Sequence, residues 1–533
     1  MIPLAAAPAR AEASIPSGEE LGAAGVRIGS IRIRRLNIFD PSDPAENYLP
    51  YRAANRLHVI TREEVIRREL LFREGDPYRQ DLIDESERNL RALDVIYNIR
   101  IRPVDYHDGV VDLEVSCQDS WTLRPSLRIS RTGGDTATSF SFSEMNLLGR
   151  MKTLSLSRRK DVDRTSTGIF YGDPRLFGTR FTLNASLADN SDGATRGLVI
   201  ARPFFSLDSH WAVNASGRHQ EQTSRLFRVG DTLAEFRQTS EFLNLSHAFS
   251  RGLRDSRVRR YGFGYGYLRN RFTQDPEDVG FGIEGLGPPA WQKFSGPYMT
   301  FQRSKSRYIT VTNYNRFNRE EDFNLGNDLN LQGQLSLRAF GAAHSEFIFS
   351  VNDFFGVPLS ESLNLFLSFS LSGRIGSGEV SNLNFSEVGE SYWRITPNQT
   401  LYTRLAFDAG IHLDGQNQLL LGGDTGLRGY PTRQFAGDRR LLFSLEHRYF
   451  GDWEILRLVR IGFASFADVG NAWYGETGVK FSELHPDYGF GLRFAVTRSS
   501  VASVSRLDFA YSVDAEQTDS PRFQILFGTA LRF

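Results

Sequence analysis

From about residue 120 to its end, the chain alternates apolar and polar residues with the period of a β-strand. In LNLFLSFSLSGR (363–374), leucine or phenylalanine occupies every second position, and serine or asparagine fills most of the others. The segment YGFGYGY (261–267) alternates aromatic residues with glycine in the same way. Successive side chains of a strand point to opposite faces, so these runs predict strands with one apolar face.

Residues 26–118 follow a different pattern, in which alternating runs are separated by helical ones. Thr61 and Glu64 have the spacing of a capping box and predict the start of a helix. Asp108-Gly109 between two alternating runs predicts a hairpin. The predicted order is strand, helix, helix, strand and strand, over residues 26–39, 61–72, 78–93, 95–107 and 110–118. This order describes one small α+β domain.

Residues 1–25 carry neither pattern. The small residues from Ala11 to Ser14 are typical of a signal-peptidase site, but a basic start and a long apolar core are missing. The segment is therefore predicted to be a signal-peptide remnant or a disordered tail.

Residues 119–533 are predicted to form a transmembrane antiparallel β-barrel. No run of 18 apolar residues occurs, which excludes a transmembrane helix but not barrel strands. A water-soluble sandwich shows the same alternation, but no second sheet partner is apparent. Short turns alternate with longer loops at 270–293 and 474–486, as in membrane barrels. The pattern gives about 20 strands, the last ending at Phe533.

Composition narrows the class of protein. The 533 residues include 63 basic and 63 acidic side chains, a balance that argues against nucleic-acid binding. The single cysteine, Cys117, cannot form an internal disulfide, and no spacing of histidines and cysteines suggests a metal site. No nucleotide, dinucleotide or hydrolase motif is present, so neither an enzymatic activity nor a cofactor is predicted.

The stretch LLLGGDTGLRGYP (419–431) surrounds one arginine, Arg428, with glycines. It lies in a predicted outer loop over 414–438. Alternation on the following strands turns Asp468 and Glu446 towards the lumen. The loop can therefore fold inward and hold Arg428 against these carboxylates. The alternative is an exposed turn with a solvated arginine.

These motifs resemble those of the outer-membrane POTRA and β-barrel assembly and translocation superfamily. This superfamily includes BamA- and TamA-like proteins, the bacterial surface antigen family and the two-partner secretion transporters. The resemblance rests on a loop motif, an FxDxG strand motif, a terminal aromatic residue and the order of elements in 26–118. The residues concerned are Gly422, Gly423, Leu427, Arg428, Gly429 and Tyr430 in the loop, Phe466, Asp468 and Gly470 in the strand, and Phe533 at the end.

The resemblance implies a barrel of about 16 strands, preceded by one periplasmic POTRA domain at 26–118. It implies that Arg428 bonds Asp468 as a lumenal lock, with Glu446 nearby. The expected function is insertion or translocation of proteins at the bacterial outer membrane. The expected partners are outer-membrane lipids and unfolded client proteins, which the POTRA domain would bind. Whether accessory periplasmic proteins also bind is left open by the resemblance. The alternatives are a secretion pore dedicated to one client and a passive porin.

Overall fold

The structure is a computed structural model that describes residues 15–93, 95–273, 289–305, 307–475, 481–497 and 504–530. The chain divides into two compact units. The first takes the chain up to Leu123 together with 145–151, and the second takes nearly all of the rest. Among the described residues, no helix combines the length and the apolar character that crossing a membrane requires.

The first unit is a three-stranded sheet packed against helices. The central strand of the sheet is β3, which runs parallel to β1 and antiparallel to β2. The elements are α1 Gly18–Ala23, β1 Arg27–Leu36, α2 Leu49–Leu57, α3 Glu63–Glu69, α4 Gln80–Arg91, β2 Ile96–His107 and β3 Val110–Asp119. Ile66 of α3, Leu90 of α4 and Leu113 of β3 are fully buried in one core. The predicted small α+β domain is therefore present.

The beginning of this unit differs from the predicted tail over 1–25. Gly18–Ala23 form the helix α1, and Leu21 is 1% exposed within the core of the unit. A capping box opens the helix, because Ser17 and Glu20 exchange hydrogen bonds with each other's backbone. One buried leucine and one capping box therefore stabilise this helix. It is too short to show the helical spacing of apolar residues in the sequence.

The predicted capping box at Thr61 and Glu64 is wrong. Helix α3 begins after Arg62 without a side-chain cap. The Thr61 hydroxyl instead donates to Asp119 Oδ2 at 2.9 Å, and the Thr61 backbone N–H donates to the same oxygen at 2.7 Å. A buried carboxylate at the end of β3 therefore competes successfully for the threonine. Helix α2 was not predicted.

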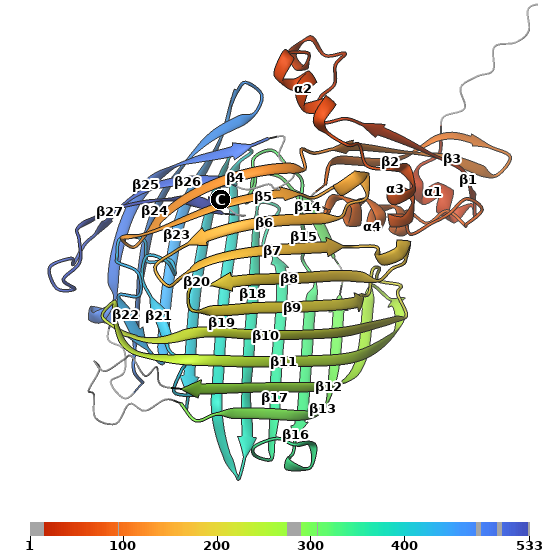
Figure 1. Cartoon of the computed structure of the whole chain (residues 1–533). Coiled ribbons are helices and arrows are strands. Elements are labelled where there is room, and N and C mark those ends of the chain that lie inside the picture. Colours follow the sequence, from red (N-terminus) through yellow and green to blue (C-terminus); the bar gives the residue numbers. More distant parts are fainter. Residues whose placement is uncertain are drawn as a thin grey trace, which may run out of the picture. The chain divides into compact units, whose positions relative to one another are not determined.

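The second unit is a closed antiparallel barrel (Figure 1). Its strands are β4 Leu123–Thr132, β5 Asp135–Glu144, β6 Thr153–Lys160, β7 Thr165–Asp173, β8 Thr182–Asn190, β9 Gly193–Arg202, β10 Trp211–Arg228, β11 Asp231–Arg254, β12 Arg257–Thr273, β13 Gln292–Lys305, β16 Asn327–Ser336, β17 Glu346–Pro358, β18 Leu363–Gly376, β19 Glu379–Thr396, β20 Gln399–Ile411, β23 Arg439–Ile455, β24 Val459–Trp473, β25 His485–Val496, β26 Val504–Ser512 and β27 Phe523–Ala530. Consecutive strands pair, and β27 closes the barrel on β4.

The barrel has 20 strands among the described residues. The count of about 20 from the alternating pattern is confirmed, and the number of about 16 taken from the resemblance is wrong. An even number returns both ends of the sheet to the same side, and whole added hairpins preserve this parity. We call the end where β4 begins and β27 ends the proximal end, and the opposite end the distal end.

Alternation along the strands separates two faces. Phe140 and Phe142 of β5 and Leu154 and Leu156 of β6 are exposed on the outer face. The inner face carries polar residues and, in places, buried charges. Two short hairpins lie between barrel strands: β14 Tyr308–Val311 with β15 Glu321–Asn324, and β21 Leu419–Leu421 with β22 Phe435–Gly437. The C-terminal Phe533 lies outside the described residues.

Candidate functional site: a buried ion network in the barrel

The LRGY loop (residues 414–438) connects β20 to β23 at the distal end. Its β21–β22 hairpin brings the two ends of the stretch together. Leu421, Leu427 and Tyr430 are fully buried and pack with Leu442 of β23 and Ala472 of β24. The inner faces of these strands therefore bind the apolar side of the loop, which excludes an exposed turn.

Arg428 lies at the centre of this packed loop. Its Nε donates to Asp468 Oδ2 at 2.7 Å and its Nη2 to Asp468 Oδ1 at 3.0 Å, while Nη1 donates to Glu446 Oε2 at 2.6 Å. The guanidinium carbon lies 3.5 Å from the centre of the Phe466 ring. Arg428 is 7% exposed and Asp468 is 2% exposed. A planar guanidinium suits this site, since it grips one carboxylate with two donors and stacks on an aromatic face.

Strand alternation explains how the acidic partners meet. In the β23–β24 ladder, Glu446 is opposite Phe466, and Ser444 is opposite Asp468. The two carboxylates therefore stand on the same face of neighbouring strands, one step apart along the diagonal. Strand alternation and pairing therefore place both carboxylates on the lumenal face independently of the loop.

Two glycines of the loop allow close approach to the wall. A Cβ at Gly429 would lie 2.6 Å from Asp487 Cβ, and a Cβ at Gly423 would lie 2.7 Å from Gly133 Cα. The Gly429 N–H donates to Asp487 Oδ2 at 2.8 Å. Any larger side chain at these positions would push the loop away from its partners.

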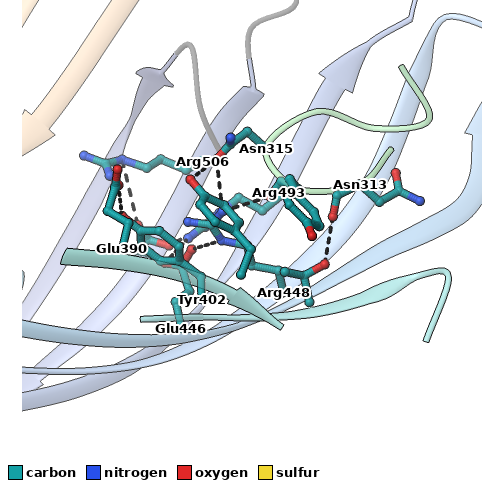
Figure 2. Close-up of polar contacts among 12 residues, drawn as sticks. Asn313, Asn315, Glu390, Tyr402, Glu446, Arg448, Arg493 and Arg506 are labelled. Atoms are coloured by element: carbon teal, nitrogen blue, oxygen red, sulfur yellow. Dashed lines mark hydrogen bonds and ion pairs between the residues drawn. The ribbon is translucent and has the colours of Figure 1, made fainter. Parts of the chain in front are cut away.

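Glu446 belongs to a wider network (Figure 2). Besides Arg428, it accepts a hydrogen bond from Arg448 Nε at 2.8 Å to Oε1, and Arg493 Nη2 lies 3.5 Å from Oε2. Arg493 also bonds Asp508 of β26. Three guanidinium groups thus meet the carboxylates of Glu446, Asp468 and Asp508. Pairing of this kind lets charges stay ionised away from water.

Four further residues of the network were not predicted from the sequence: Arg448, Arg493, Asp487 and Asp508. Each stands on the lumenal face of its strand, where alternation leaves a charged residue pointing inward. That signal was available. The partners of these residues on other strands were not, since pairing depends on the register of the ladders.

Tyr430 attaches the loop to the last strands. Its hydroxyl donates to the carbonyl of Pro486 at 3.0 Å and also contacts Asp514. Phe435 stacks on His485 with ring centres 4.2 Å apart, and Tyr430 packs edge-on against both rings. The aromatic residue of the motif therefore has a partner on each side.

Arg433 and Thr432 attach the loop to the first strands of the barrel, beyond the junction of β27 with β4. Arg433 forms a bidentate ion pair with Asp163 in the β6–β7 turn, with Nη1 3.0 Å from Oδ1. Thr432 donates two hydrogen bonds at the β4–β5 turn, from its N–H to the Gly133 carbonyl and from its hydroxyl to the Thr132 carbonyl, both at 2.9 Å. The partners in these contacts lie more than half the chain apart in sequence, and no sequence pattern predicted them.

The remaining predicted residues take supporting positions. Gly422 N–H donates to the Thr425 hydroxyl at 2.8 Å and shapes the loop. A Cβ at Gly470 would lie 2.9 Å from a methyl group of Leu421, so the loop packs directly on that position. Phe466 provides the ring under Arg428.

Part of the first unit matches a known protein family. Residues 58–116 match the family model described as "POTRA: Surface antigen variable number repeat". The first unit therefore contains a POTRA domain. A POTRA domain followed by a closed antiparallel barrel resembles the outer-membrane POTRA-barrel superfamily. No curated protein matches the sequence.

Several solved structures resemble most of the chain. BamA from Haemophilus ducreyi lacking POTRA domains 1–3 is 13% identical, with 94% of this chain and 84% of that chain covered and a TM-score of 0.39. CdiB from Acinetobacter baumannii is 11% identical, with 95% and 73% covered and a TM-score of 0.40. CdiB from Escherichia coli is 11% identical, with 96% and 77% covered and a TM-score of 0.44.

Proposed function

We propose that this protein inserts client proteins into the bacterial outer membrane through the junction between β4 and β27. The observation that carries the proposal is that this junction joins the first and last strands of the barrel, which no turn connects. Phe527 of β27 pairs with Arg131 of β4 in this junction. On its other side, β27 pairs continuously with β26, from Tyr511↔Phe523 to Val504↔Ala530. When two paired strands separate, their unpaired edges become templates for another strand.

The membrane location is part of the proposal. The exposed apolar residues on the outer face of the barrel suit contact with lipid, and several charged residues, such as Arg448 and Arg493, are buried on the inner face. In this arrangement the barrel lies in the outer membrane and the POTRA domain in the periplasm. There the POTRA sheet receives an unfolded client by adding the client as a strand at its edge.

The LRGY loop contacts both sides of the junction between β4 and β27 at the distal end. Thr432 bonds the β4–β5 turn, as described above. Gln434 Nε2 donates to the Thr518 carbonyl, in the connection between β26 and β27, at 2.8 Å. Release of the loop would free both edges together. Arg428, Asp468 and Glu446 are therefore proposed as the residues that hold the junction closed, with no catalytic role.

A second candidate is a secretion pore dedicated to one client. It is favoured by a lumenal cavity of about 700 Å³ between β11 and β19, whose walls carry amide and aromatic side chains such as Asn244, Gln334 and Tyr298 beside one ion pair, Arg374–Asp414. An extended chain could cross a lumen lined in this way. A passive porin is disfavoured, since an open pore needs no buried lock.

Depletion of the protein followed by quantitative proteomics separates these functions. We expect other outer-membrane barrels to decline in the membrane, and wild-type protein, but not the Arg428→Ala variant, to restore them. Loss of one protein from the culture medium with an unchanged membrane would identify a dedicated pore instead. An unchanged membrane and an unchanged medium would contradict both.

A further inference from the structure

The residues between β13 and β16 form a segment that the barrel itself does not need. The β13–β16 ladder already closes at Lys305↔Asn327. Two other connections at the proximal end consist of only two residues, Asp255-Ser256 between β11 and β12 and Pro397-Asn398 between β19 and β20. We call residues 307–326 the insert. It extends a connection that two residues would complete.

The insert holds its own fold. Its β14–β15 hairpin pairs from Tyr308↔Asn324 to Val311↔Glu321. At the tip, Glu321 Oε1 accepts the backbone N–H groups of Tyr314 at 3.2 Å and Asn315 at 2.9 Å. A loop with this internal order is a built element rather than a loose connection.

The insert lies against the inner wall of the barrel. Tyr314 stacks on Tyr392 of β19 with ring centres 4.8 Å apart, and its hydroxyl accepts a hydrogen bond from Asn364 Nδ2 of β18 at 2.7 Å. Phe317 packs on Phe450 of β23 at 5.1 Å. Tyr314 is 1% exposed and Phe317 is 4% exposed. These wall residues lie on the lumenal faces of their strands, so the tip occupies the lumen.

One arginine connects the insert to the ion network. Arg448 Nη1 donates to the Tyr314 carbonyl at 2.9 Å and to Asn315 Oδ1 at 3.2 Å. The same guanidinium donates through Nε to Glu446 Oε1. Figure 2 shows Arg448 between Asn315 and Glu446. The other oxygen of Glu446 accepts Arg428 of the LRGY loop.

A single carboxylate therefore serves two segments that enter the lumen from opposite ends. The LRGY loop comes from the distal end and binds Glu446 directly. The insert comes from the proximal end and binds it through Arg448. Departure of either segment admits water to the shared carboxylate, and water weakens the ion pairs that hold the other.

We propose that the insert is a second plug of the barrel lumen, coupled to the LRGY loop through Arg448 and Glu446, so that loosening either segment loosens the other. Thermodynamic coupling of this kind is reciprocal. The inference goes beyond the proposed function, because it concerns the lumen and holds whichever client the barrel serves.

The plug itself is tested by conductance of the full-length protein in planar lipid bilayers. One variant replaces residues 306–326 with Asp-Ser, copying the β11–β12 turn, and we expect its conductance to rise severalfold over wild type. A second variant, Asn364→Ala with Thr400→Ala, removes the bonds to the Tyr314 hydroxyl and, at 2.8 Å, to the Asn313 carbonyl. It should also conduct more, in brief openings. Wild-type conductance in both folded variants would overturn the plug.

The coupling is tested by trypsin, because each segment carries its own arginines. In the Asn364→Ala, Thr400→Ala variant we expect faster cleavage at Arg316 in the insert and also at Arg433 in the LRGY loop. In Asp468→Asn, which loosens only the loop directly, cleavage at Arg316 should rise as well. Faster cleavage confined to the segment that was altered would overturn the coupling.

A matched control uses the same kind of substitution elsewhere on the lumenal wall. Ser370 of β18 donates to Asn352 of β17 at 2.9 Å, away from both segments. Ser370→Ala with Asn352→Ala should leave conductance and both cleavage rates at wild-type values. An increase in that control equal to that of the test variant would show general loosening of the wall and overturn the inference.

Discussion

At the scale of residues, the protein depends on charges that it has removed from water. Arg428, Arg448 and Arg493 are all below 8% exposed, and so are Glu446, Asp468 and Asp508. A buried pair of this kind adds little over an apolar equivalent, but loss of one member leaves its partner buried and unpaired. The network therefore fixes the loop in one position while adding little net stability, as expected of a group that holds the loop closed.

Arg428→Ala should free the loop. Asp468 would lose both of its guanidinium bonds, at an expected cost of about 3–5 kcal/mol. Arg433→Ala is the matched control, since the pair of Arg433 with Asp163 is partly exposed and should cost only about 1 kcal/mol or less. Trypsin cleavage at the remaining arginine of the loop, with the thermal transition of the folded barrel, measures both. Equal behaviour of the two variants would contradict a specific lock.

Cys117 offers a native probe of the first unit. Burial raises the pKa of the Cys117 thiol to about 12, and nearby Asp119 adds to the effect. At pH 8 only about one thiol in ten thousand is then a thiolate, the form that reacts. We expect a maleimide reagent to label the folded protein slowly and the urea-unfolded protein quickly. Labelling of folded protein at the rate of a free cysteine would be inconsistent with this burial.

At the scale of elements, the spacing of apolar residues predicted long strands and helices correctly. It failed for short elements that place only one or two residues in the core. The alternation in 363–374 appears as β18, and the two helical runs near 61–93 appear as α3 and α4. Helix α1 was missed because Leu21 alone faces the core. The capping box at Thr61 failed because Asp119, far along the chain, claims its hydroxyl. The contacts that fix the LRGY loop depend on ladder register, which one sequence does not reveal.

The part played by α1 can be measured through the same cysteine. Leu21→Ala should lower the free energy of unfolding of the first unit by about 2–4 kcal/mol, since it removes a buried side chain. Leu49→Ala, on α2, is the control, because Leu49 is 73% exposed and its loss should change stability by less than about 0.5 kcal/mol. The urea midpoint of Cys117 labelling reports both. No shift for Leu21→Ala would exclude α1 from the core.

At the scale of the whole molecule, closure of the barrel between its first and last strands and a lumen occupied from both ends point to the same route. The lumen carries the LRGY loop and the insert, each held by buried contacts, while β4 and β27 meet without a connecting turn at a junction that includes Phe527↔Arg131. A client strand can reach the edges of β4 and β27 without passing through the occupied lumen. The proposed path for a client strand therefore runs through the wall of the barrel.

The most direct measurement locks that junction. Arg131→Cys with Phe527→Cys, in a Cys117→Ala background, places thiols at directly paired positions, roughly 4.5–5.5 Å apart at Cα, within the range that a disulfide spans. Phe509→Cys with Ile525→Cys locks the neighbouring β26–β27 ladder as a control. We expect the oxidised junction variant to fail to restore outer-membrane barrels in depleted cells until a reductant is added, with the control active throughout. Full activity of the oxidised junction variant would contradict insertion through the wall.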